Sequence, residues 1–172
     1  ETYEKFRAKS KTVMPEAFSG SEKTLRQLKV LYEDADILII NKPSGMLSQK
    51  ARPEDVSANE YILSYLLREG ALTEEEMRTF RPSVCNRLDR NTSGILIAGK
   101  TLKGLQEMSK ALKERTIQKY YRCVVKGEVL REDYLKGWLV KDERENKVTV
   151  STVKPKSADA APIETAYRPI WT

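Results

Sequence analysis

The sequence predicts an α+β fold, with a mixed, mainly antiparallel sheet and helices packed against it. Short apolar runs come in pairs that are joined by brief polar turns, and segments with helical periodicity occur only occasionally between them. The strict strand–helix alternation that is typical of parallel sheets is missing. The length of 172 residues, with 40% hydrophobic and 33% charged residues, fits one well-packed domain.

The first strand pair is expected at residues 28–32 and 37–40, with an acidic turn at residues 33–36 between the two strands. A helix follows over residues 55–68, where apolar side chains recur on one broad side. A short acidic helix is expected from Thr73 to Met77, with Thr73 as its cap and an acidic residue three positions later.

The purely apolar residues 95–98 predict a buried strand, and Thr101 can cap the helix that comes next. In that helix, apolar side chains at helical spacing are expected to face the core: Leu102, Leu105, Met108 and Leu112.

Four strand segments are expected in the remainder of the chain. Residues 117–125 alternate cleanly, so that one face would carry Ile117, Lys119, Tyr121, Cys123 and Val125. Residues 138–140 and 148–150 are expected to pair as a hairpin, and residues 163–170 would form the last strand.

The domain organisation predicted from composition has two parts. Residues 1–27 are polar and are interrupted by Ser19-Gly20-Ser21, so we interpret them as a linker or as the tail of a preceding module. The folded part is expected to begin at residue 28 and to continue to residue 172.

Positive charge is concentrated in one part of the chain. Residues 81–127 carry eleven basic and three acidic side chains, whereas residues 32–80 carry five basic and ten acidic ones. A local basic surface attracts polyanions, and nucleic acid is the commonest polyanionic partner of proteins. The alternative is a solvated basic helix face that has no partner.

Several classes of site and partner are not indicated. The chain has no histidine, and Cys85 and Cys123 match no zinc or redox spacing, so we expect buried reduced thiols, no metal and a cytoplasmic location. No glycine-rich phosphate loop is present, so a nucleotide cofactor is not expected. No apolar run approaches the roughly 18 residues of a membrane helix, so a membrane partner is not expected either.

The strongest candidate site is residues 86–94, where Asp89 stands between Arg87 and Arg90 and precedes a turn-forming Asn-Thr-Ser-Gly. Guanidinium groups favour the ionised form of a neighbouring carboxylate, which suits a nucleophile or an electrostatic stabiliser. The alternative from the residues alone is a loop ion pair that fixes the turn.

Three segments together resemble the RluA-type pseudouridine synthase family. One is Arg87-Leu88-Asp89 followed, after two residues, by Thr92-Ser93-Gly94. The others are residues 30–45, which resemble the family's first motif, and residues 119–127, which resemble the strand that bears its characteristic tyrosine. Order and spacing agree, strongly over residues 28–127 and loosely over residues 128–172.

The resemblance implies an RNA pseudouridine synthase fold and activity, with Asp89 as the catalytic aspartate that attacks the target uridine. Attack on the sugar and attack on the base both remain open. Arg87 would enter the RNA stack and hold the target base flipped out, which offsets an unstacking cost of a few kcal/mol. Tyr121 would stack on the uracil and handle its carbon-5 proton, although core packing also fits an inward tyrosine.

Three further residues are expected to contact RNA: Asn86, Arg90 and Lys119. Asn86 stands where the family usually has histidine, which indicates a subfamily difference. The family's third, C-terminal motif is not found before Thr172, so we expect a truncated and by itself inactive catalytic domain. The substrate would be structured ribosomal or transfer RNA; the rival interpretations are a non-catalytic RNA-binding module and a basic structural domain.

Overall fold

The computed structural model describes residues 29–142, 147–156 and 159–171 of the chain. The linker predicted over residues 1–27 lies outside these residues. The chain divides into two compact units, Glu1–Lys119 and Tyr120–Thr172, and each is described by itself. The prediction of one catalytic-domain part over residues 28–172 therefore stays a prediction.

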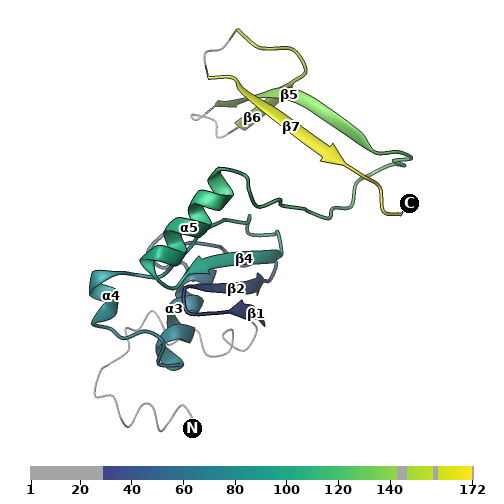
Figure 1. The fold of residues 1–172 in the computed structure, drawn as a ribbon. Helices are drawn as coiled ribbons and strands as arrows, with labels where there is room; N and C mark the ends of the chain where they lie inside the picture. The colour runs from purple at the N-terminus through teal and green to yellow at the C-terminus, as the bar shows by residue number, and fades with distance from the viewer. Residues whose placement is uncertain (1–28, 143–146, 157–158, 172) are drawn as a thin grey trace. The chain divides into compact units, whose positions relative to one another are not determined.

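The first unit contains a four-stranded sheet in the order β1-β2-β4-β3, in which all neighbours are antiparallel (Figure 1). Its strands are β1 (Lys29–Glu33), β2 (Ile37–Lys42), β3 (Ser83–Val84) and β4 (Gly94–Gly99). This arrangement confirms the predicted first strand pair and the predicted strand at residues 95–98, as well as the α+β class.

Helix α3 (Ala58–Arg68) supplies one side of the hydrophobic core, which confirms the helix expected over residues 55–68. Alternate residues of β2 and β4 supply the other side, since side chains two apart on a strand share a face. The core residues of these elements are Leu38, Ile40, Leu96 and Ala98 from the strands and Ala58, Ile62, Leu63 and Leu66 from the helix.

The short acidic helix is α4 (Glu76–Thr79), preceded by a reciprocal capping box. The Glu76 carboxylate accepts from the Thr73 main-chain N–H at 2.8 Å, and the Glu76 N–H donates to Thr73 Oγ1 at 3.2 Å. The predicted roles of Thr73 and the glutamate are confirmed, although the helix itself begins three residues later than expected.

Helix α5 (Leu102–Lys113) begins at the predicted cap, where Thr101 Oγ1 accepts from the Gly104 N–H at 3.1 Å. The expectation that Leu102 faces the core is wrong, because 54% of its surface is exposed. The helix approaches the β1–β2 turn at Gly104, where an added Cβ would lie 2.1 Å from the Asp36 carbonyl oxygen. Leu102 lies two residues, about 200° of helical rotation, from that contact.

The second unit is a three-stranded antiparallel sheet in the order β6-β5-β7. Its strands are β5 (Asp133–Asp142), β6 (Lys147–Ser151) and β7 (Ala161–Tyr167). Leu139 pairs with Val150 and Val140 with Thr149, which confirms the predicted hairpin. The last strand is also present, three residues shorter at its end than predicted.

The prediction of a strand over residues 117–125 is wrong, since this segment forms no strand. Tyr121 is 62% exposed, and Cys123 is exposed rather than buried. Alternation favours a strand only where a neighbouring strand completes the hydrogen-bond ladder and a core covers one face.

In the described part of the chain, no helix is long and apolar enough to cross a bilayer.

Candidate active site

Asp89 lies on the loop between β3 and β4, at the first residue of a tight turn. Its carbonyl oxygen accepts from the Thr92 N–H at 3.0 Å. The loop enters β4 at Gly94, whose φ of +134° is readily adopted only by glycine. The Asp89 side chain is exposed, and within the described residues its carboxylate accepts no hydrogen bond and takes part in no ion pair. The carboxylate is therefore free to meet a ligand.

Asn86 ties the start of this loop to β4. Its side-chain amide donates to the Ile95 carbonyl oxygen at 3.1 Å, and its side-chain oxygen accepts from the Ile97 N–H at 2.8 Å. In these two hydrogen bonds the Asn86 side chain pairs with the main chain of β4, as the main chain of a neighbouring strand would. Asn86 is thus a loop anchor, and the predicted contact with RNA stays a prediction.

Residues 44–48, just after β2, hold the other side of the loop. The Gly45 N–H donates to the Arg90 carbonyl oxygen at 2.8 Å, and Ser44 Oγ donates to the Asn91 carbonyl oxygen at 2.9 Å. Gly45 has a φ of +88°, another left-handed conformation that favours glycine. The Asn-Lys-Pro-Ser-Gly turn of the sequence therefore supports the loop that bears the aspartate.

Lys42 lies beneath the loop and was not predicted as a functional residue. It is fully buried, and its Nζ donates to three carbonyl oxygens: those of Met46 at 2.8 Å, Pro43 at 3.0 Å and Arg90 at 3.2 Å. Burial lowers the pKa of this ammonium, and the negative charge of Asp89 opposes that shift. Two-residue periodicity could have found it, because Lys42 continues the buried face of Leu38 and Ile40.

The remaining predicted site residues fall into two groups. Arg87 and Arg90 are exposed and lie on the same loop as Asn86 and Asp89. Lys119 is exposed at the end of the first unit, and Tyr121 is exposed at the start of the second. The structure thus gathers four of the six predicted residues on one loop.

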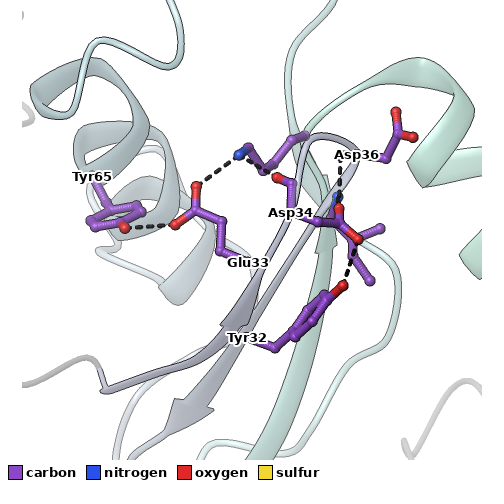
Figure 2. Close-up of polar contacts among 7 residues, drawn as sticks. Tyr32, Glu33, Asp34, Asp36 and Tyr65 are labelled. Carbon is purple, nitrogen blue, oxygen red and sulfur yellow. Dashed lines mark hydrogen bonds and ion pairs between the residues drawn. The ribbon is translucent and has the colours of Figure 1, made fainter.

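A second polar cluster occupies the β1–β2 turn, where residues of β1 and of α3 meet Lys100, the residue after β4 (Figure 2). Glu33 accepts from Lys100 Nζ at 2.7 Å and from the Tyr65 hydroxyl at 2.7 Å. Hydrogen bonding to Glu33 is the main cause that raises the pKa of Tyr65 to about 12. Asp34 Oδ1 accepts from the N–H groups of Asp36 and Ile37, both at 2.8 Å, which closes the predicted acidic turn.

This cluster stands apart from the Asp89 loop. β2 begins at the turn with Ile37, and its last residue, Lys42, pairs with Gly94 at the end of the loop. The six residues of β2 separate the two places by about 17 Å. The cluster therefore fastens the sheet to α3 and does not contribute to the site.

Among the residues that the structure describes, no group of three histidine, cysteine, aspartate or glutamate side chains could hold a metal ion. Cys85 and Cys123 are both free thiols. The chemistry available at the loop is that of one carboxylate with arginines beside it.

Comparisons with known proteins agree on one family. A family model described as RNA pseudouridylate synthase matches residues 36–170. The chain is 31% identical over 126 residues to an uncharacterized RNA pseudouridine synthase of Mycoplasma genitalium, covering 72% of this chain and 38% of that protein. It is 34% identical over 104 residues to the ribosomal large subunit pseudouridine synthase C of Vibrio vulnificus, covering 58% of this chain and 28% of that protein.

A solved structure has a similar fold. The human RNA pseudouridylate synthase domain containing 4 matches with a TM-score of 0.57 at 14% identity, over 89% of this chain and 57% of that chain. The chain spans about a third of the length of the curated relatives described above. Because the family model covers most of the chain, we conclude that the chain belongs to the RNA pseudouridylate synthase family.

Proposed function

We propose that this chain carries the catalytic aspartate of an RNA pseudouridine synthase, an isomerase that converts uridine to pseudouridine in structured ribosomal RNA. Relatives named ribosomal large subunit pseudouridine synthase support ribosomal RNA over transfer RNA as the substrate. The observation that carries the proposal is Asp89 itself, an exposed carboxylate with no hydrogen bond or ion pair among the described residues, on a loop whose main chain is fixed on both sides.

In the proposed reaction, Asp89 attacks the flipped-out uridine and the bond between base and ribose breaks. The base then rotates and rejoins the same ribose carbon through its carbon 5, and the bond to Asp89 breaks so that the carboxylate is released. Carbon 5 gives up its proton while the former glycosidic nitrogen gains one. The product is an isomer of the substrate, so the atoms balance without an oxidant, a reductant or a cofactor. A fixed nucleophile lowers the entropic cost of such an attack.

The neighbouring residues have supporting roles in this proposal. Arg87 is exposed two residues before Asp89, where a guanidinium can enter the space left by the extruded base. Tyr121 stacks on the uracil and handles the proton at carbon 5 of that base. Further contacts to the RNA come from Arg90, Lys119 and Asn86. Phosphate contacts by basic residues contribute much of the affinity of such complexes.

A non-catalytic RNA-binding module is the rival function, and the eleven basic side chains of residues 81–127 favour it equally. The discriminating experiment replaces Asp89 by Ala in the full-length cellular protein and maps pseudouridine across cellular RNA. The proposal predicts that at least one pseudouridine disappears while the variant protein still binds RNA. If every modified position survives in the mutant, the binding-module function is correct.

A cytoplasmic location belongs to the same proposal, because ribosomal RNA is the proposed substrate and both cysteines are free thiols.

A further inference from the structure

We infer that Ser48 is a positioning residue for Asp89, an inference that rests on the function proposed above. Ser48 Oγ contacts both main-chain polar groups of Leu88, the residue just before Asp89. It accepts from the Leu88 N–H at 2.9 Å and donates to the Leu88 carbonyl oxygen at 2.7 Å. One hydroxyl thereby satisfies both the N–H donor and the carbonyl acceptor of Leu88, as a neighbouring strand would do in a sheet.

Ser48 can fix another residue because it is itself fixed. Only 4% of its surface is exposed. Its carbonyl oxygen accepts from the Asn59 N–H at 3.2 Å, and the Leu47 carbonyl oxygen accepts from the Ala58 N–H at 2.8 Å. Both donors belong to the first turn of α3, whose N–H groups have no partner within the helix. The first turn of α3 therefore fixes the main chain at Leu47 and Ser48, and Ser48 in turn fixes the loop that bears Asp89.

Leu88 transmits this position to the aspartate. Its side chain packs against the hydrophobic core, while its main chain is bound by Ser48. Leu88 is thus held at two points, and Asp89 is joined directly to the peptide carbonyl that Ser48 binds. The Asp89 carboxylate accepts no hydrogen bond from a described residue, and its interaction with the Lys42 ammonium is purely electrostatic, so the main chain is what fixes its place through hydrogen bonds.

The two bonds of Ser48 differ from the other loop contacts in where they act. Lys42 and Gly45 bind Arg90, and Asn86 binds β4, so these contacts lie after Asp89 or at the base of the loop. Ser48 acts on the peptide unit that directly precedes the reacting residue. A displacement of about 1 Å at a reacting group can cost about 100-fold in rate, so losing this contact should slow the chemical step.

The test compares Ser48→Ala with Ser64→Ala in the full-length protein, under conditions where circular dichroism shows both variants folded. Ser64 is the matched control, because it is 2% exposed and its hydroxyl also donates to a main-chain oxygen, that of Glu60 in α3, at 3.0 Å. We expect Ser48→Ala to lower kcat for pseudouridine formation by about 10- to 100-fold, with KM for RNA changed less than about twofold. Ser64→Ala should leave both constants near those of the wild type.

A second measurement does not depend on activity. Amide hydrogen exchange should become at least about tenfold faster at Leu88 and Thr92 in Ser48→Ala, and remain unchanged there in Ser64→Ala. If Ser48→Ala does not fold, Ser48→Cys keeps the volume with a weaker donor and acceptor, and should give intermediate values of kcat and exchange.

The inference is overturned if Ser48→Ala retains wild-type kcat, if only KM changes, or if loop exchange is unaltered. Failure of the proposed function looks different. In that case the wild-type protein converts no uridine, and the exchange measurement still decides whether Ser48 holds the loop.

Discussion

At the scale of single residues, the site is a contrast between a free carboxylate and a tightly bound main chain. Asp89 has no side-chain partner among the described residues, whereas Leu88, Arg90 and Asn91 are all bound through main-chain atoms by residues 42–48. A carboxylate bound by side chains would owe its position to those side-chain contacts. The loop instead places the charge through its backbone.

Lys42→Met tests the support beneath the loop. Methionine fills a similar volume, but the carbonyl oxygens of Pro43 and Met46 lose their donor, which we expect to lower the free energy of unfolding by about 1–3 kcal/mol. Urea unfolding followed by helical circular dichroism measures this change. Lys50→Met is the control, since Lys50 Nζ also binds a carbonyl oxygen but is exposed, and it should change stability by less than about 0.5 kcal/mol. Equal effects of the two variants would contradict the assigned role of Lys42.

The residues of the site could be predicted from the sequence only in part. Asp89 and its arginines stand in one short segment, so the sequence indicates them directly. Ser48 lies 40 positions from its partner Leu88, and no local pattern relates the two. Lys42 had a local signal in the period of β2, but a lysine is seldom expected on a buried face.

At the scale of elements, the sequence correctly predicted those features that are stabilised by interactions between residues close together in the chain. The cap at Thr101, the capping box at Thr73 and the hairpin of β5 and β6 each depend on residues close in sequence, and all three are present. The segment over residues 117–125 has the same alternation as a strand, yet it forms none. Its pattern was right for a strand, but a strand also requires a partner that the alternation cannot reveal.

The β1–β2 turn makes the stability of the first unit depend on pH. Burial acts to raise the pKa of Glu33, but hydrogen bonds from Lys100 and Tyr65 outweigh it, and the net pKa lies below the ordinary 4.5. The pKa of Asp34 is lowered chiefly by the Ile37 N–H, and that of Asp36 chiefly by the Thr101 hydroxyl, each from 3.8.

Because these carboxylates bind protons less readily in the folded chain than in the unfolded one, their stabilisation is present above the ordinary pKa values. It is lost as the pH falls below about 4.5 and through the lower, folded pKa values. Urea unfolding at a series of pH values should show this loss, and Glu33→Gln should reduce the pH dependence. A dependence unchanged in Glu33→Gln would mean that other groups cause the acid sensitivity.

At the scale of the whole molecule, charge is separated along the chain, with the excess positive charge around and after the Asp89 loop. In α5, Lys103 is neutralised by Asp36 at 3.1 Å, whereas Lys113 is exposed and has no ion pair among the described residues. The basic side chains open to RNA phosphates are therefore fewer than the total count suggests.

Binding to structured RNA should weaken as salt increases, with a linear fall of log K against log salt concentration. Lys113→Gln should reduce that slope by about 1 if its ammonium contacts a phosphate, whereas Lys50→Gln, in the acidic segment, should leave the slope unchanged. Filter binding across a salt series measures both. Affinity that does not depend on salt would contradict an RNA-binding role for this surface.

The most direct measurement of the central claim is single-turnover conversion of uridine to pseudouridine by the full-length protein and by its Asp89→Asn variant. Asparagine keeps the size of the side chain and removes the nucleophile, so the rate should fall by at least about a thousandfold while the Kd for RNA stays within about threefold. Glu107→Gln, which removes an exposed carboxylate from α5, should retain the wild-type rate. Conversion by Asp89→Asn at a rate within about tenfold of the wild type would contradict the claim that Asp89 is the nucleophile.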